Sequence, residues 1–302
     1  MFTNDTTLII PTRNRYKLLL RILRQIFKLN IKFNEIIIID SSEKKEKKLI
    51  KELKKKYKIN LYFSKPSSSL QRNIGLKKMN LKNKFVMFLD DDVFFLKNAF
   101  KEMEKIVKKY RYDDEIVGFC FNQIERRKVS LFEKLKTSKL LKKINLYSDL
   151  PGKVTNSGWH TKILNVREDI LADWVFTTAS IYKTKMIKNK FFTNLFGQYS
   201  YLEDLDFSLN ATRLKKYFIL SSKAKFKHPY NIDRSGFIFG KVEIFNRYKI
   251  IKKYRLNMFL FLINVFLRFL ISFSKILILN FNSFKRALGN ILALIVILFE
   301  QK

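Results

Sequence analysis

The first 120 residues alternate between short apolar runs and stretches with helical spacing of apolar residues, and this alternation constrains the fold more than any other feature. The strand-like runs lie at 7–11, 35–40, 61–64, 84–89 and 115–121. The helix-like stretches include 43–57, 67–79 and 97–110, with a serine at the N-cap of the second. Continuous apolar strands that alternate with helices are typical of a mostly parallel sheet covered on both faces, so we expect an α/β, Rossmann-like fold.

Carboxylates follow two of these runs. Asp40 ends the run 35–40, and Asp90, Asp91 and Asp92 follow the run 84–89. Since ligands of parallel sheets bind beyond the carboxyl ends of the strands, a site is expected there. Adjacent ionised carboxylates repel one another, which favours either a solvated turn or a bound cation such as Mg²⁺, and the pattern alone does not choose between the two.

A second acidic cluster, EDLD, opens a predicted helix at 201–214. For this segment alone, the favoured interpretation is that the acids complement the helix dipole. The alternative is that one of them is a general base. Leu202, Leu205 and Leu209 mark the apolar face of the helix. At about 100° per residue Asp204 points away from that face, so it could line a cleft.

Length and charge narrow the class of protein. The 302 residues, 47% of them apolar, suit one large domain or two small ones with a hydrophobic core. The chain carries 61 Lys and Arg against 26 Asp and Glu, a formal charge of +35. Such a charge attracts nucleic acids, phosphorylated substrates or an anionic membrane, and charge alone does not choose among them. A coding bias toward AT-rich codons also explains part of the lysine excess.

The cysteine, histidine and glycine content excludes several kinds of site. Cys120 is the single cysteine, so no intrachain disulfide can form and we expect a reducing compartment. One cysteine and two histidines cannot supply a structural zinc site. The sequence has no G-x-G-x-x-G, P-loop or G-x-S-x-G motif, so phosphate chemistry would rely on a metal or on basic side chains. MFTNDTTLIIP lacks the pattern of a secretory signal, which favours a cytoplasmic location.

Residues 257–279 form a 23-residue apolar stretch that follows a basic helix candidate at 236–253 and is long enough to span a bilayer. Its polar residues recur on one helical face: Asn257, Asn264, Arg268, Ser272 and Lys275. A central arginine costs about 2.5–3.5 kcal/mol in a spanning helix, and the next apolar run, 287–299, is short. We therefore favour helices that lie in the membrane interface over a transmembrane hairpin. The alternative is that this face packs on the rest of the chain or on another subunit.

Five segments occur in the order seen in glycosyltransferase family 2, and over about residues 6–230 the chain resembles that family. They are TLIIPTRNR (7–15), EIIIIDSSE (35–43), QRNIG (71–75), FLDDDV (88–93) and YLEDLDFSL (201–209). The resemblance implies a GT-A fold and an inverting transfer of a sugar from a nucleoside-diphosphate-sugar to a hydroxyl of a glycan or lipid-linked acceptor. It also implies a Mg²⁺ or Mn²⁺ cofactor and a place in bacterial surface polysaccharide synthesis.

The resemblance further implies roles for individual residues. The nucleotide-sugar would contact Pro11, Thr12, Arg13, Asp40, Arg72, Asn73, Asp90 and Asp91. Asp92 of the D-x-D motif would bind the metal, with Asp90 as a further candidate ligand. Asp204 matches the catalytic base, and Glu203 beside it would orient the acceptor. The chain departs from the family at Asp40-Ser41, where two aspartates are frequent, and at the middle Asp91, which could shift the metal to a different carboxylate.

Two more residues are candidates for the site. His228, in KFKHPY, is by itself more typical of a structural histidine. Several family members place a metal-coordinating histidine in this region, so His228 is a candidate third ligand. Trp159, in NSGWHT, lies in the irregular basic stretch 124–172 and could stack on an acceptor sugar or simply pack.

Together these patterns predict a GT-A catalytic domain at 1–235 and a basic, apolar helical tail at 236–302. We expect the tail to hold the enzyme peripherally on the cytoplasmic face of the inner membrane, against anionic lipid. A basic nucleic-acid-binding protein is an alternative, but it would leave the acidic clusters unexplained, so we expect no nucleic-acid partner. A sugar nucleotidylyltransferase has a related fold but needs a glycine-rich phosphate loop, which PTRNR does not provide.

Overall fold

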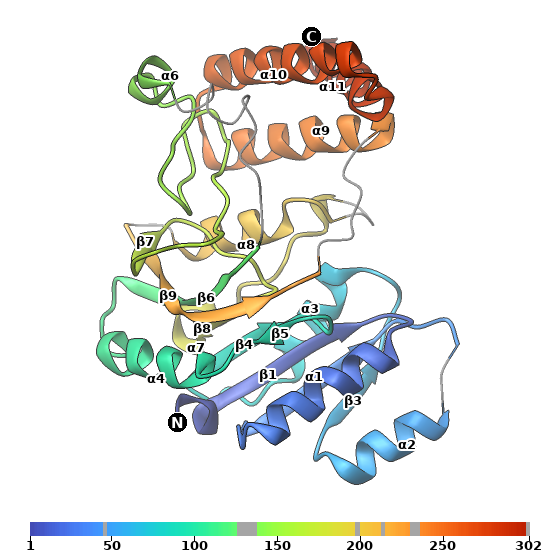
Figure 1. Cartoon of the computed structure of the whole chain (residues 1–302), viewed down its shortest axis with the longest axis vertical. Helices are drawn as coiled ribbons and strands as arrows, with labels where there is room; N and C mark the ends of the chain where they lie inside the picture. Colours follow the sequence, from blue (N-terminus) through green and yellow to red (C-terminus); the bar gives the residue numbers. More distant parts are fainter. Residues whose placement is uncertain (45–46, 126–137, 197–199, 213–214, 230–235, 300–302) are drawn as a thin grey trace. The chain divides into compact units, whose positions relative to one another are not determined.

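The computed structural model describes residues 1–44, 47–125, 138–196, 200–212, 215–229 and 236–299. The chain divides into two compact units (Figure 1). Unit 1 comprises Met1–Arg126 and Ile163–Pro229, and unit 2 comprises Arg127–Lys162 and Tyr230–Lys302. The sequence prediction placed residues 127–162 in the first domain, whereas the structure groups the described part of this segment, residues 138–162, with the C-terminal helices. Residues 126–137 of the stretch lie outside the described residues.

Unit 1 is built on a central sheet, which has nine strands within the described residues. In sheet order these are β3 (Asn60–Phe63), β2 (Glu35–Asp40), β1 (Thr6–Thr12), β4 (Phe85–Leu89), β8 (Ala179–Lys183), β6 (Ile116–Gln123), β9 (Tyr217–Lys227) and β5 (Phe94–Phe95), with β7 (Ile170–Ala172) paired to β9. Six strands run in one direction, and β5, β7 and β8 run in the other. The predicted α/β fold with a mostly parallel sheet is confirmed.

Helices cover both faces of this sheet. They are α1 (Tyr16–Lys28), α2 (Lys47–Lys56), α3 (Ser68–Lys78), α4 (Ala99–Tyr110), α7 (Thr184–Ile187) and α8 (Glu203–Ala211), with 3-10 turns η1 (Phe2–Asp5) and η2 (Asn194–Phe196). Successive strand residues point to opposite faces, so Leu8 and Ile10 share a core with α1 and α4. On the other face Phe88 packs edge-on against Phe207 of α8, with ring centroids 5.9 Å apart.

Helix α3 lies close against the sheet. Ser67 caps its N-terminus by accepting a hydrogen bond from the Leu70 N–H, which confirms the predicted serine cap. A β-carbon at Gly75 would lie 2.6 Å from Cγ2 of Ile9, so only glycine allows this approach. The same approach brings Gln71 within reach of the strand ends. Its Nε2 donates to the carbonyl oxygen of Thr12, the last residue of β1, at 2.9 Å, and to that of Ile39, the penultimate residue of β2, at 2.8 Å.

The described part of unit 2 is helical. Its elements are α6 (Lys139–Lys143), α9 (Gly236–Tyr254), α10 (Met258–Phe273), the 3-10 turn η3 (Ser274–Ile278) and α11 (Phe281–Phe299). Helices α9 and α11 run side by side (Figure 1) and touch through their backbones. A β-carbon at Gly240 would lie 2.3 Å from the Arg286 carbonyl oxygen, and one at Gly289 would lie 2.2 Å from that of Phe237. Glycine at both positions therefore allows the two helices to pack closely.

The C-terminal helices differ in extent from the prediction. α11 begins at Phe281 and has 19 residues, so it is longer than the apolar run 287–299. Met258–Leu277 and Phe281–Phe299 are both long and apolar enough to cross a membrane by length and composition, a property that core helices of soluble proteins share. Only 22% and 28% of their most apolar stretches are buried, which is low for core helices.

Candidate active site

The carboxyl ends of β1 and β4 lie beside each other because the two strands pair in parallel. Thr12, the last residue of β1, donates from Oγ1 to Oδ2 of Asp91 at 2.6 Å. Asp91 is buried, and this burial raises the pKa of its carboxyl to about 6, although the hydrogen bond from Thr12 opposes the shift. The middle aspartate of the DDD run is therefore held by the protein itself, and its two neighbours have the more open positions.

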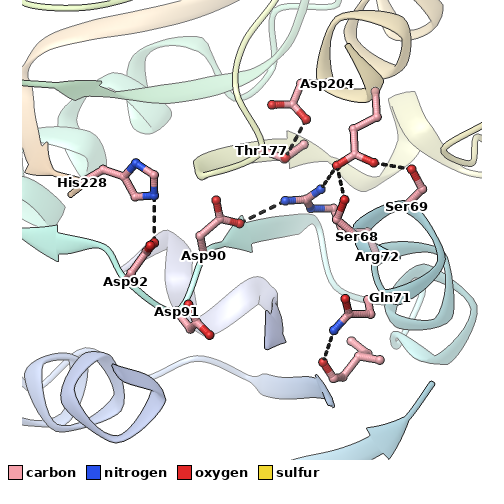
Figure 2. A network of polar contacts seen from close by, with 12 residues as sticks. Ser68, Ser69, Gln71, Arg72, Asp90, Asp91, Asp92, Thr177, Asp204 and His228 are labelled. Atoms are coloured by element: carbon pink, nitrogen blue, oxygen red, sulfur yellow. Dashed lines mark hydrogen bonds and ion pairs between the residues drawn. The ribbon is translucent and has the colours of Figure 1, made fainter. Parts of the chain in front are cut away.

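Asp90, Asp92 and His228 form a candidate metal site, since their potential ligand atoms all lie within 4.8 Å of one another (Figure 2). His228 Nε2 is 2.8 Å from Oδ1 of Asp92. Burial alone would lower the pKa of His228, but Asp92 outweighs it and raises that pKa. For Asp92, burial would raise the pKa, and His228 outweighs it and lowers it. Two carboxylates and an imidazole suit a divalent cation such as Mn²⁺, so the residues present fit a metal.

Arg72 of α3 joins two carboxylates that are far apart in the sequence. Its guanidinium contacts Glu203 through Nη1 and lies 3.0 Å from Oδ1 of Asp90 through Nη2 (Figure 2). Glu203 also accepts hydrogen bonds from Ser68, at 2.7 Å, and from Ser69. Burial would lower the pKa of Arg72, but the charges of Glu203 and Asp90 raise it, so the guanidinium stays charged. The carboxylate predicted to orient an acceptor is thus engaged by α3.

Asp204 follows directly in α8 and is far less constrained. Thr177 donates from Oγ1 to Oδ1 of Asp204 at 3.1 Å, as Figure 2 shows. The residue is partly exposed, but protein surrounds the carboxyl, and this burial raises its pKa to about 6 against the opposing charge of Arg72. Leu202 precedes the helix in a left-handed backbone conformation, with φ of +75°. A weakly tied carboxylate with a pKa near neutrality is suited to accept a proton.

Four more of the residues predicted to bind the nucleotide-sugar are Pro11, Arg13 and Asp40, at the ends of β1 and β2, and Asn73, in the middle of α3. Three of them have protein partners. Asp40 is buried and accepts hydrogen bonds from Tyr16 and from the backbone and side chain of Ser42. Arg13 pairs with Glu43 at 2.8 Å on the surface. Pro11 is the penultimate residue of β1, and Asn73 exchanges two hydrogen bonds with the Phe192 backbone.

Trp159 belongs to unit 2. The Arg247 guanidinium lies over its ring, 3.8 Å from the centroid, and Tyr147 meets it edge-on at 6.4 Å. The packing alternative for Trp159 therefore has direct support in these contacts. Its acceptor role stays a prediction.

Sequence reasoning missed several polar partners of the site. They are Arg15, Tyr16, Ser42, Ser68, Ser69 and Thr177. Nη1 of Arg15 lies 3.1 Å from Oδ2 of Asp92, and the Arg15 side chain is 51% exposed. The repeated hydroxyl residues in SSS at 67–69 were a signal, although they were interpreted only as a helix cap.

Comparison with known proteins supports the fold described above. A family model described as "Glycosyl transferase family 2" matches residues 7–167. No curated protein sequence matches the chain.

Solved structures of the same fold include TarS from S. aureus and GalNAc-T7. Residues 1–349 of TarS, crystallised in complex with UDP-GlcNAc, are 16% identical with a TM-score of 0.51, over 82% of this chain and 66% of that one. A longer TarS structure is 17% identical with a TM-score of 0.50, over 82% and 39%. GalNAc-T7 with UDP, GalNAc and Mn²⁺ is 12% identical with a TM-score of 0.56, over 76% and 44%. The chain thus spans less than two thirds of each.

Proposed function

Since the chain belongs to glycosyl transferase family 2 and has the GT-A fold, we propose that it transfers a sugar from a nucleoside-diphosphate-sugar to a hydroxyl group with inversion at the anomeric carbon. One observation carries the proposal. Asp204, with a pKa of about 6, follows Glu203 in α8, and Glu203 pairs with Arg72, which also pairs with Asp90 of the D-x-D motif. Figure 2 shows Asp204 and the D-x-D aspartates around the same site. A proton acceptor and a cation site are the two features that this reaction needs.

The proposed base acts on the acceptor. Asp204 would accept the proton of the acceptor hydroxyl while its oxygen forms the new bond to the anomeric carbon. The bond from that carbon to the diphosphate breaks on the opposite face, so the configuration inverts. At pH 7 a carboxyl with a pKa of about 6 is mostly ionised yet more basic than an ordinary aspartate, which favours this role. Thr177 holds one carboxylate oxygen, and the other can face the hydroxyl.

The donor would bind over the strand ends. We propose that Thr12 and the backbone near Pro11 border the nucleoside, and that Asp90 and Arg72 lie near the ribose and diphosphate. Asp92 and His228, with Asp90, would hold Mg²⁺ or Mn²⁺. When bound, such a cation neutralises charge that develops on the leaving diphosphate. TarS and GalNAc-T7 were crystallised with UDP or a UDP-sugar, so UDP-sugars are the first donors to test.

Glu203 receives a revised role in this proposal. It was predicted to orient the acceptor, but Ser68, Ser69 and Arg72 engage its carboxylate. We propose that Glu203 instead fixes the start of α8 against α3. In that position it would set the direction of Asp204, which follows it in the chain.

The acceptor and its location are proposed from unit 2. Two helices with the length and composition of membrane segments support an acceptor that is itself held at a membrane, such as a lipid-linked glycan. We propose a peripheral enzyme on the cytoplasmic face of the inner membrane. Release of the protein from membranes by high salt or carbonate would support this, and retention until detergent is added would contradict it.

The decisive experiment measures nucleotide release from UDP-, GDP-, TDP- and CMP-sugars with Mg²⁺, with Mn²⁺ and with a chelator. The proposal expects release from one nucleoside-diphosphate-sugar, dependence on the cation, and none from the CMP-sugar, which has no diphosphate. Asp114→Asn, which removes the carboxylate of an exposed surface ion pair, is the matched control for Asp204→Asn in this assay and should release nucleotide as the parent does. No release from any donor with any acceptor lipid would overturn the proposal.

A further inference from the structure

Helices α10 and α11 of unit 2 turn large apolar side chains to the outside. On α10 these include Phe259, Phe266 and Phe273, and on α11 Leu288, Leu292 and Ile295, each 37–70% exposed. Their spacing of three, four or seven residues places each set on one stripe of its helix. The stripes lie on helices that pack against each other. We name these two stripes the outer face.

The stripes meet in the turn between the helices. Residues 277–281, which we call the elbow, include three exposed apolar side chains: Leu277 is 83% exposed, Leu279 76% and Phe281 58%. Together with Ile238, Leu277 and Leu279 are the most exposed large apolar side chains among the described residues of this unit. Lys275 and Lys285 flank the elbow, one on each side. In a lipid bilayer the apolar side chains of the elbow could contact the acyl chains, while the two lysines contact the anionic head groups.

Polar side chains of the same helices point inward. Asn264 of α10 is fully buried, accepts a hydrogen bond from Tyr147 at 2.8 Å and donates to Ser157 at 2.9 Å. Arg286 of α11 donates to the buried Glu243 of α9 at 2.6 Å. The polar face that the sequence predicted for α10 is therefore the packed face. Polar and small residues inside, with large apolar residues outside, are typical of proteins that meet lipid.

The positive charge of residues 236–299 favours an anionic bilayer over a second copy of the chain as the partner of the outer face. Within 236–299 there are ten Lys and Arg and one acidic residue, Glu243, which is buried. The charge exposed on this segment is therefore positive. A second copy would bring an equally positive surface and be repelled, whereas an anionic bilayer is attracted.

We propose that the outer face lies flat in the interface of an anionic lipid bilayer, with the elbow inserted deepest. The packing of α9 along α11 sets this orientation. A hairpin that crossed the bilayer would carry α9 with it, and α9 contains Lys241, Lys249, Lys252 and Lys253. Charges of this kind cost a few kcal/mol each inside a bilayer. The proposal rests on the proposed membrane location but not on the catalytic chemistry.

The test uses the full chain and measures lipid binding without any sugar donor. Flotation with phosphatidylcholine vesicles is compared with flotation with vesicles that also contain an anionic phospholipid. We expect binding to the anionic vesicles, and a loss of at least tenfold in the double variant Leu277→Glu, Leu279→Glu. Leu81→Glu, at an apolar residue of unit 1 that is 57% exposed, is the matched control and should bind as the parent does. Donor turnover is assayed separately, so a failure of either property is seen by itself.

Insertion can be measured at a single residue because Cys120 is buried and so does not compete for labelling. Leu279→Cys carries an environment-sensitive fluorophore, with Leu81→Cys as the control. We expect anionic vesicles to shift the emission of the first label to the blue and to leave the second unchanged. Equal binding of the double glutamate variant, or an unshifted label at residue 279, would overturn the proposal. So would a dimer in lipid-free solution that the double glutamate variant abolishes, because the outer face would then bind a second copy.

Discussion

Units 1 and 2 each bury a cluster of arginine and carboxylate side chains, and the two clusters are opposite in composition. In unit 1 a single arginine, Arg72, lies between Glu203 and Asp90. In unit 2 a single carboxylate, Glu243, lies among arginines that include Arg268 and Arg286. The pKa values follow: that of Arg72 is raised and that of Glu243 is lowered to about 2, each against the effect of burial.

The two clusters differ in which charge is in excess. Around Arg72 the acids outnumber the base, because the carboxylates of Glu203, Asp90 and Asp204 all act on one guanidinium. Around Glu243 the bases outnumber the acid. A surplus of carboxylates attracts a cation and can take up a proton, and a surplus of arginines favours anions. The same pair of residue types therefore supports the proposed chemistry in one unit and helix packing in a basic region in the other.

The largest effect is expected when Asp204, one of the excess carboxylates of unit 1, is replaced. Asp204→Asn should lower kcat by about 10²–10⁴-fold, because an amide cannot accept the acceptor proton. Donor affinity, measured by calorimetry with the nucleotide and Mn²⁺, should change less than twofold. A variant with parental kcat would remove Asp204 from the mechanism.

The next prediction compares the same substitution in the two clusters. Glu203→Gln leaves the buried Arg72 with Asp90 but without the Glu203 carboxylate, and Glu243→Gln removes the carboxylate that Arg268 and Arg286 share. Each variant should lower the free energy of unfolding by about 3 kcal/mol. Only Glu203→Gln should also lower kcat, since it alone lies beside Asp204. Thermal unfolding and donor turnover are measured on both. Comparable losses of kcat in two variants that remain folded would contradict the assignment of chemistry to unit 1 alone.

The free energy of unfolding should depend on pH in opposite ways for Glu243 of unit 2 and Asp204 of unit 1. Glu243 has a depressed pKa, so the stability it contributes is present above pH 4.5 and is lost as pH falls through about 2, an effect of up to about 3 kcal/mol. Asp204 has a raised pKa, so its contribution has the opposite slope and falls as pH rises from about 4 to about 6. Urea unfolding between pH 2 and 7 should lose the first slope in Glu243→Gln and the second in Asp204→Asn. Unchanged slopes in both variants would refute these assignments.

The smallest effect is on the rate profile. Because the proposed base must be ionised, kcat/KM should rise about tenfold per pH unit up to about 6 and then level off. The profile is measured with saturating Mn²⁺, and the residual activity of Asp204→Asn supplies the control. A plateau that extends unchanged down to pH 4.5 would be inconsistent with a base of this pKa.

The sequence predicted best where a local pattern and a tertiary position coincide. Five apolar residues followed by aspartates at 85–92 indicated a buried strand that ends at a site, and β4 with Asp90 and Asp92 has that arrangement. The order of the strands in a parallel sheet then brought Thr12 and Asp91 together. Contacts such as those of Ser68 and Ser69 with Glu203 could not be predicted, because more than 130 residues separate the partners.

The C-terminal helices show a second limit. Helical spacing correctly grouped Asn264 with Arg268 and Ser272, but periodicity does not reveal what a face contacts. Only the partners Tyr147, Ser157 and Glu243, from distant segments, show that this face is turned inward. The contacts of Trp159 were likewise not predictable: the sequence shows its aromatic side chain but not that Arg247 lies over its ring.

The start of α8 has a consequence for the timing of catalysis. Three donors from α3 hold Glu203, and the left-handed Leu202 sets the turn before it. The backbone that carries Asp204 is therefore positioned when the chain folds, while its carboxylate is held more weakly, by the hydrogen bond from Thr177. If Asp204 is the base, as proposed, each catalytic cycle begins with its backbone already in position, so less of the activation entropy comes from the enzyme and more from the acceptor that must bind beside it.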